Sequence, residues 1–170
     1  MDPNLILLYQ NEIEHNFKTL SSRRIANGYA PHAACLFAAM FKYAKSDIGI
    51  FSWKLDEKVF GDEIFRMALQ QFKSSSREVR VRIIVQERPT DWIKELFQDR
   101  RIRLYETVTY KKEISNFSFV DTTGYRYKAN REQVKAVACA FDPGINKAIR
   151  DNFEIAFKDA KGLKVSEDTK

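Results

Sequence analysis

The sequence predicts a mixed α/β fold: a mainly parallel central sheet with helices on both faces, preceded by an N-terminal extension of two helices. Three observations support this prediction. Between residues 47 and 104, segments with strand and helix periodicity alternate, which is typical of parallel strands joined by crossover helices. Strands joined by short turns follow up to residue 141 and predict antiparallel additions. A closing helix then begins after Asp142-Pro143-Gly144.

The length and composition favour one globular domain. A chain of 170 residues suits a single domain, and a domain of this size buries roughly 70% of its extended-chain surface, so it needs no disulfide or metal. Cys35 and Cys139 stand in apolar surroundings, as buried free thiols of a reducing compartment do. The start lacks the basic segment of a signal peptide, and no apolar run approaches the ~20 residues of a membrane span. We therefore expect a cytoplasmic protein.

Residues 1–45 are expected to form the helical extension. Over residues 4–20, apolar side chains recur every three or four positions, which predicts an amphipathic helix. The pair Asn27-Gly28 predicts a turn.

A second helix is predicted over residues 31–44, with Pro31 in its first turn. This helix is apolar nearly all round, so it is expected to be buried either in the domain or against a partner. In the second case a two-fold dimer is expected. Its interface candidates are Phe37, Met40 and Phe41.

The segment 46–162 is expected to form the α/β domain, and 163–170 a disordered tail. The strand predicted over 47–54 has apolar groups on both faces, which indicates that helices cover it on both sides. The expected elements are a strand over 47–54, a helix over 60–72, a strand over 79–85, a helix over 90–98 with Thr90 as N-cap, a strand from 102, strands over 117–121, 124–127 and 134–141, and a helix from 142.

The positive charge is uneven. The net charge is +6, and residues 77–112 hold ten basic and six acidic side chains. Such a basic segment favours an anionic partner, with a solvated polar surface as the alternative. Alternation places Arg80 and Arg82 on one strand face, and Arg126 and Lys128 on one face of a later strand. The candidate nucleic-acid-binding residues are Arg80, Arg82, Lys94, Arg101, Arg103, Arg126 and Lys128.

The order of elements and its ending resemble one half of the phospholipase D superfamily. The residues that carry the resemblance are the strand 117–121, the turn and strand 122–127, the strand 134–141 and the helix through Phe153 and Phe157. In that family a strand with a His-x-Lys motif runs into an Asp, and a later strand bears Gly-Ser-x-Asn. The resemblance covers about residues 46–160. It extends to small bacterial endonucleases of this type, which carry a single half and complete the active site by dimerisation.

The family's catalytic motif is degenerate in this sequence. Counting back from Asp121, the family's His falls at Ile114 and its Lys at Asn116. The Gly-Ser-x-Asn position corresponds roughly to residues 138–141, which read Ala-Cys-Ala-Phe. The family uses His as nucleophile and as general acid, and Ile114 serves neither purpose. The resemblance thus implies a non-catalytic copy, in which Asp121 is expected to cap the turn before Gly124.

Other motifs are weaker. His32 and Cys35 lie three residues apart on one predicted helix, as a nucleophile pair or as a surface His beside a core Cys. Two Cys and two His at these spacings do not make a zinc site, and no glycine-rich phosphate loop is present. The acidic pairs 56–57 and 62–63 suit either a hard cation or helix N-termini. We assign no catalytic residue, metal ligand or cofactor.

Three classes of function remain. The first is a non-catalytic phospholipase D-like module that binds nucleic acid or another anionic partner through a basic face. The second is a protein-interaction subunit that pairs through helix 31–44. The third is a phosphodiester hydrolase whose active site the sequence does not reveal.

Overall fold

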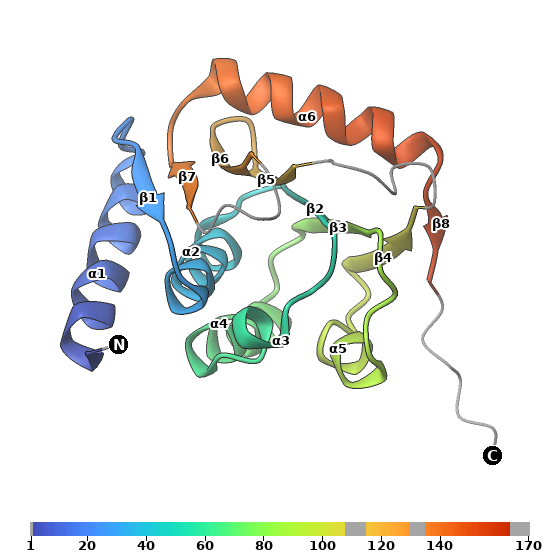
Figure 1. Ribbon diagram of the computed structural model, residues 1–170, viewed down its shortest axis with the longest axis horizontal. Helices are drawn as coiled ribbons and strands as arrows, with labels where there is room; N and C mark the ends of the chain where they lie inside the picture. Colours follow the sequence, from blue (N-terminus) through green and yellow to red (C-terminus); the bar gives the residue numbers. More distant parts are fainter. Residues whose placement is uncertain (1, 108–114, 130–134, 164–170) are drawn as a thin grey trace.

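The computed structural model describes residues 2–107, 115–129 and 135–163 (Figure 1). Its strands form one sheet, in which they stand in the order β1-β7-β6-β5-β2-β3-β4-β8. The strands are β1 (Ile25–Asn27), β2 (Asp47–Ser52), β3 (Arg80–Val85), β4 (Ile102–Glu106), β5 (Asn116–Val120), β6 (Gly124–Lys128), β7 (Ala136–Cys139) and β8 (Lys161–Gly162).

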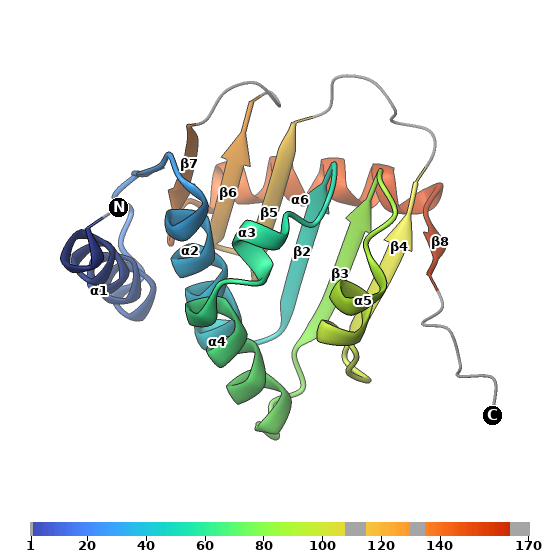
Figure 2. The same cartoon turned by 60° about the horizontal axis from the view of Figure 1, so that its bottom comes forward.

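Helices cover both faces of this sheet, as expected. The helices are α1 (Pro3–Thr19), α2 (Ala30–Tyr43), α3 (Glu57–Phe60), α4 (Glu63–Ser74), α5 (Asp91–Leu96) and α6 (Pro143–Lys158). Figure 2 shows α2, α3, α4 and α5 on one face and α6 behind the strands on the other. Helix α1 packs against α2 and lies beside β1 at the edge of the sheet (Figure 1).

The strand pairing confirms a mixed sheet. Strands β2, β3 and β4 pair in parallel, because crossover helices join them. The later strands, β5, β6 and β7, join by short connections and pair antiparallel. Gly49 in β2 lies opposite Phe119 in β5, whose ring lies 2.1 Å from where a Cβ would be. A larger residue than glycine would therefore displace that ring.

The main hydrophobic core contains residues from both predicted segments, 1–45 and 46–162. It includes Ile13 and Phe17 of α1 together with Val81 of β3, all buried. A second core lies under α6, around Phe119 and Phe153. The segment 1–45 also supplies β1, which pairs antiparallel with β7. The sequence did not predict this strand, because three residues carry no readable alternation.

Helix α2 is enclosed by its own chain. Its residues from Ala33 to Phe41 are all buried, and α1, α3 and α4 pack around it. Phe37, Met40 and Phe41 are only 5%, 1% and 0% exposed. The prediction that these three side chains form a dimer interface is therefore wrong, because the domain itself covers them. The apolar side chains of α2, for which the sequence offered two possible locations, are buried inside the domain.

Some boundaries differ from the prediction. The helix expected over 60–72 is two helices, because Asp56 and Asp62 each accept a hydrogen bond from a backbone N–H and cap separate N-termini. Thr90 precedes α5, but its hydroxyl lies 3.1 Å from Glu57 Oε1 and makes no cap bond. Of the expected tail 163–170, only Leu163 lies within the described residues. In the described part of the chain, no helix has the length and apolarity to cross a membrane.

Candidate anion-binding pocket

A hollow of about 220 Å³ lies at the C-terminal end of β2, between the sheet and the helices α2 and α3. We call it the Arg126 pocket. Its lining residues are Ala33, Phe37, Ile50, Phe51, Ser52, Trp53, Lys54, Asp56, Val59, Phe60, Asn116, Arg126 and Lys128. Strands β2 and β5 are antiparallel neighbours, so the end of β2 lies beside the start of β5. The chain leaves β2 at this point and continues to α3, which covers the pocket from one side.

The strand register brings the polar residues of this pocket together. Asn116 lies opposite Lys128, and Ser118 opposite Arg126, in the antiparallel pair of β5 and β6. Alternate residues of a strand share a face, so Arg126 and Lys128 both point toward α2. The guanidinium carbon of Arg126 lies 5.4 Å from the ring centre of Phe37 on that helix. The alternation in the sequence thus correctly placed Arg126 and Lys128 on one face.

Arg126 is half-buried and makes few polar contacts for such a cation. Its Nη2 lies 3.4 Å from Asn27 Oδ1, a long hydrogen bond. Its Nε atom is buried and has no hydrogen-bond partner within the described residues, and the same is true of Asn27 Nδ2. Burial lowers the pKa of Arg126 to about 10. Two residues joined by one long hydrogen bond therefore each keep a buried donor without an acceptor, which an anion or an ordered water could satisfy.

Two lysines add positive charge to the pocket. Burial lowers the pKa of Lys128, and the nearby charge of Arg126 lowers it further. The Nζ of Lys54 lies 5.4 Å from the ring centre of Trp53. Among the described lining residues, Asp56 is the one carboxylate, and it caps α3. Three cations therefore face one anion, an excess of two positive charges.

Asn116, which the resemblance places at the position of the family's lysine, lines this pocket. Its side-chain oxygen accepts a hydrogen bond from the backbone N–H of Trp53 at 2.8 Å. That bond fixes the loop that follows β2. Ile114, at the position of the family's histidine, lies outside the described residues.

Asp121 has a structural role at the opposite end of β5. Its carboxylate accepts backbone N–H bonds from Lys45, Ser46 and Asp47 at 2.8 to 3.1 Å. Its φ is 51°, in the left-handed region that Asp tolerates. The prediction that Asp121 caps the turn before Gly124 is wrong. The side chain has a structural role, but it accepts hydrogen bonds from the loop between α2 and β2.

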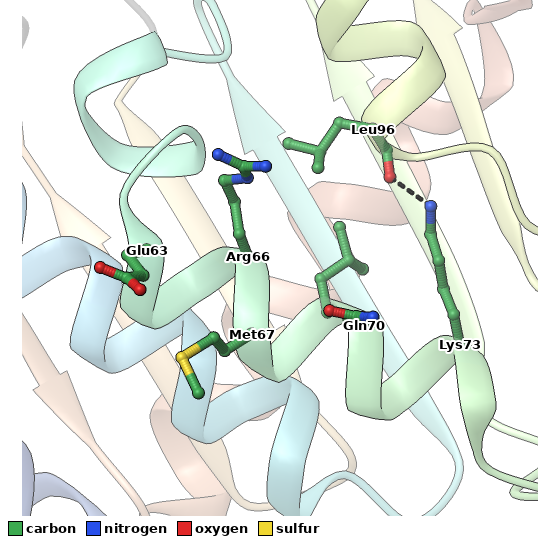
Figure 3. A pocket seen from close by; sticks show the side chains of 7 residues that line it. Glu63, Arg66, Met67, Gln70, Lys73 and Leu96 are labelled. Carbon is green, nitrogen blue, oxygen red and sulfur yellow. Dashed lines mark hydrogen bonds between the residues drawn. The ribbon is translucent and has the colours of Figure 1, made fainter.

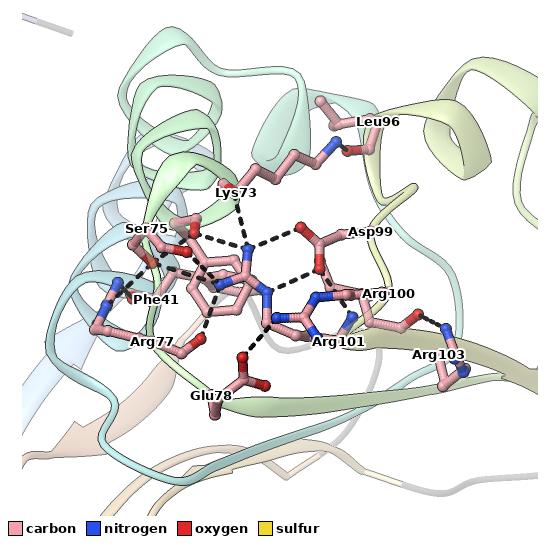
Figure 4. A network of polar contacts seen from close by, with 12 residues as sticks. Phe41, Lys73, Ser75, Arg77, Glu78, Leu96, Asp99, Arg100, Arg101 and Arg103 are labelled. Carbon is pink, nitrogen blue, oxygen red and sulfur yellow. Dashed lines mark hydrogen bonds and ion pairs between the residues drawn. The ribbon is translucent and has the colours of Figure 1, made fainter.

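Within its described residues, 77–107, the basic segment does not gather into one free surface. Figure 4 shows Arg101 at the centre of a polar network in which its guanidinium donates to the backbone and to Asp99. The carbonyls that accept from it belong to Phe72, Lys73, Ser75 and Arg77, at 2.8 to 3.0 Å. Its bond with Asp99 lowers the pKa of that carboxyl. Arg101 therefore closes the end of α4.

The other predicted arginines lie on the α6 face or on the surface. Arg80 and Arg82 both contact the buried Asp47, at 3.0 and 3.2 Å, and Arg82 also pairs with Glu154 at 2.7 Å. Arg103 lies opposite Arg82 in the sheet and donates to Ile102 O at 3.3 Å.

Lys94 is buried on α5 with its Nζ 2.5 Å from Asp91. Of the seven predicted residues, Arg126 and Lys128 line the Arg126 pocket, and Lys94 and Arg103 line a separate hollow of about 360 Å³ beside α5.

A larger hollow of about 440 Å³ lies between α4 and α5 (Figure 3). Arg66 and Lys73 point into it from α4. The Nζ of Lys73 donates to Leu96 O at 2.6 Å, so this cation already binds the end of α5. Burial lowers its pKa. This hollow has no counterpart of the buried, unpaired Arg126 Nε among the described residues.

The His32–Cys35 pair does not form a reactive centre. His32 stacks on Tyr9 with ring centres 4.0 Å apart, and burial lowers its pKa. Burial also raises the pKa of Cys35 to about 11, which disfavours the thiolate that a nucleophile needs. In the described ranges, no group of three His, Cys, Asp or Glu side chains could hold a metal ion.

Solved structures of the same architecture include a member of the phospholipase D family. Nuc from Salmonella typhimurium, a member of that family, matches with a TM-score of 0.55 and 13% identity, over 84% of this chain and 99% of its own. NucT from Helicobacter pylori matches with a TM-score of 0.57 and 8% identity, over 83% and 98%. The chain therefore has the phospholipase D-like fold.

A third structure with this fold is TrmBL2, an archaeal chromatin protein that binds DNA. It matches with a TM-score of 0.58 and 10% identity, over 92% of this chain and 61% of its own. The comparison with curated protein sequences found no match. One family model matches residues 29–163, and the chain belongs to that family, described as a domain of unknown function, DUF7931.

Proposed function

We propose that this chain is a non-catalytic phospholipase D-like module that binds the phosphate groups of nucleic acid in the Arg126 pocket. One observation carries the proposal: the Nε of Arg126 is buried and, within the described residues, has no acceptor. Removing a charged group from water is costly unless a partner offsets the loss. A fold that keeps such a group in the lining of a hollow is prepared for an anion.

The chemistry of the pocket suits phosphate. A guanidinium is planar and matches two phosphate oxygens with two parallel N–H bonds, which a lysine cannot do. Lys54 and Lys128 then add charge without fixed direction. TrmBL2 shares this fold and binds DNA, which supports nucleic acid as the partner but, at 10% identity, indicates no residues.

The residues of the pocket also support the absence of catalysis. Asn116 occupies the position of the family's lysine, and its oxygen already accepts the Trp53 N–H. An isoleucine, at 114, occupies the position of the nucleophilic histidine. The two histidines of the chain are on α1 and α2. Arg126 remains protonated and is no general base.

Binding is tested by fluorescence anisotropy with a labelled single-stranded DNA that carries a 5′ phosphate. We expect the parent protein to bind, and the affinity to fall steeply as salt rises from about 50 to 200 mM. Arg126→Met should weaken binding by about tenfold or more, since a charge-assisted hydrogen bond is lost. Arg103→Ala is the matched control, because it removes one arginine outside the pocket.

The same samples test catalysis. After prolonged incubation with DNA, RNA and a generic phosphodiester, we expect no cleavage product above background. Cleavage by the parent protein would contradict the non-catalytic part of the proposal. Equal DNA affinity of the parent and Arg126→Met, or no DNA binding by the parent at low salt, would contradict the binding part.

A further inference from the structure

The Arg126 pocket is small and has largely apolar walls. Its volume of about 220 Å³ is below the roughly 300 to 1,000 Å³ of pockets that take drug-sized ligands. Apolar side chains from the sheet and from α2 and α3 wall it, among them Phe37, Phe51 and Phe60. Arg126 lies on β6 with Phe37 packed against its guanidinium. A ligand group must therefore pass between these walls to reach the buried Nε.

This shape discriminates between two kinds of phosphate. An internal phosphodiester carries a nucleoside on each side, and both would have to enter the hollow with it. A terminal phosphate monoester is attached through a single oxygen and extends beyond its sugar. It can enter the hollow and contact Arg126 while the rest of the strand stays outside.

The charges of the pocket discriminate in the same direction. Arg126, Lys128 and Lys54 face Asp56, which leaves two positive charges in excess. A phosphate monoester carries about −1.5 to −2 at pH 7, because its second pKa is about 6. An internal phosphodiester carries a single negative charge. The excess charge of the pocket matches the monoester.

From these observations we infer that the pocket binds the phosphorylated end of a nucleic acid strand, taking a terminal phosphate monoester in preference to an internal phosphodiester. This inference rests on the proposed function, and it adds the class of phosphate that the site takes.

The test is competition between DNA strands of one sequence that differ only at their ends. The competitors carry a 5′ hydroxyl, a 5′ phosphate or a 3′ phosphate, or are closed into a circle, and each displaces a labelled 5′-phosphorylated strand. We expect at least one phosphorylated strand to compete about tenfold better than the hydroxyl-ended and circular strands. That advantage should vanish in Arg126→Met and persist in Arg103→Ala. Circular dichroism spectra of both variants should match that of the parent.

Two contrary results are distinguishable. If the circle competes as well as every phosphorylated strand while Arg126→Met weakens all of them, end recognition is wrong and phosphate binding at Arg126 stands. If no strand binds, or if Arg126→Met binds every strand like the parent, the proposed function fails as well.

Discussion

Arg101 and Arg126 are both arginines held beneath the surface, and the fold treats them differently. Arg101 donates to four backbone carbonyls and to Asp99 (Figure 4). Arg126 has one long bond to Asn27 and, within the described residues, a buried Nε without an acceptor. A guanidinium whose N–H groups all have protein acceptors stabilises the folded structure. A guanidinium with a buried N–H that lacks an acceptor lowers the stability of the protein, and a bound ligand can offset that loss.

The structural use of arginine is repeated in this chain. Arg101 satisfies carbonyls at the C-terminal end of α4, where the helix leaves its last carbonyls without intrahelical donors. Arg77 does the same for α2, donating to the carbonyls of Phe41, Lys42 and Ala44 at 2.8 to 3.1 Å. Two arginines of the segment 77–112, Arg77 and Arg101, therefore close helix ends.

The largest expected effect is on stability at Arg101. Arg101→Met should lower the free energy of unfolding by about 3–5 kcal/mol, because it leaves Asp99 and several carbonyls without their donor. Urea denaturation followed by circular dichroism measures this. Arg100→Met is the control, since its side chain is 75% exposed in a pair with Glu78, and exposed pairs contribute at most about 1 kcal/mol. A similar small loss of stability for both variants would contradict a structural role for the hydrogen bonds of Arg101.

Part of this stability should depend on pH. The Arg101 bond holds the pKa of Asp99 below its usual value. A carboxyl with a lowered pKa in the folded state stabilises the protein above its unfolded pKa of about 3.9 and loses that contribution as the pH falls. The stability difference between the parent and Asp99→Asn should therefore shrink as the pH falls below about 4. A difference that is constant between neutral pH and acid would contradict the ion pair.

A smaller loss is expected at Asp121. Asp121→Ala removes an acceptor of three backbone N–H groups and places a non-glycine, non-Asp residue at a φ of 51°. We expect a loss of about 1–3 kcal/mol in the free energy of unfolding. DNA affinity should not change, because this residue ends β5 on the side away from the Arg126 pocket. A marked loss of binding by the folded variant would show that the two ends of β5 act together.

At Arg126 the stability effect should be near zero or of opposite sign. Replacing a buried, poorly paired charge with an apolar side chain of similar length is often neutral or stabilising, here by up to about 1–2 kcal/mol. Arg126→Met should therefore unfold at the same or a higher urea concentration than the parent. A loss comparable to that of Arg101→Met would indicate that Arg126 is also structural.

The smallest effect is expected at the rim. Lys54 is exposed, so Lys54→Ala should leave the stability unchanged. If Lys54 contacts phosphate, the slope of log affinity against log salt should decrease by about one. An unchanged slope would exclude Lys54 from the binding site and leave Arg126 and Lys128 as its cations.

The sequence predicted the layered architecture because periodicity reports which face of each element is buried. It did not predict β1, which has three residues, or the division of residues 57–74 into two helices, which depends on Asp62 acting as a second N-cap. The same reasoning placed Arg126 and Lys128 on one face. It could not separate Arg126 from Arg101 or Arg82, because their partners come from distant segments, such as Glu154 of α6 for Arg82.

Thermal unfolding of the parent and Arg126→Met, each with and without a 5′-phosphorylated DNA strand, tests the central claim most directly. A ligand that binds only the folded state raises the melting temperature. We predict that the variant alone melts at or above the temperature of the parent alone, and that the DNA raises the melting temperature of the parent clearly more than that of the variant. A variant that melts well below the parent, or a DNA-induced increase of equal size in both proteins, would contradict the claim that Arg126 is kept for a phosphate.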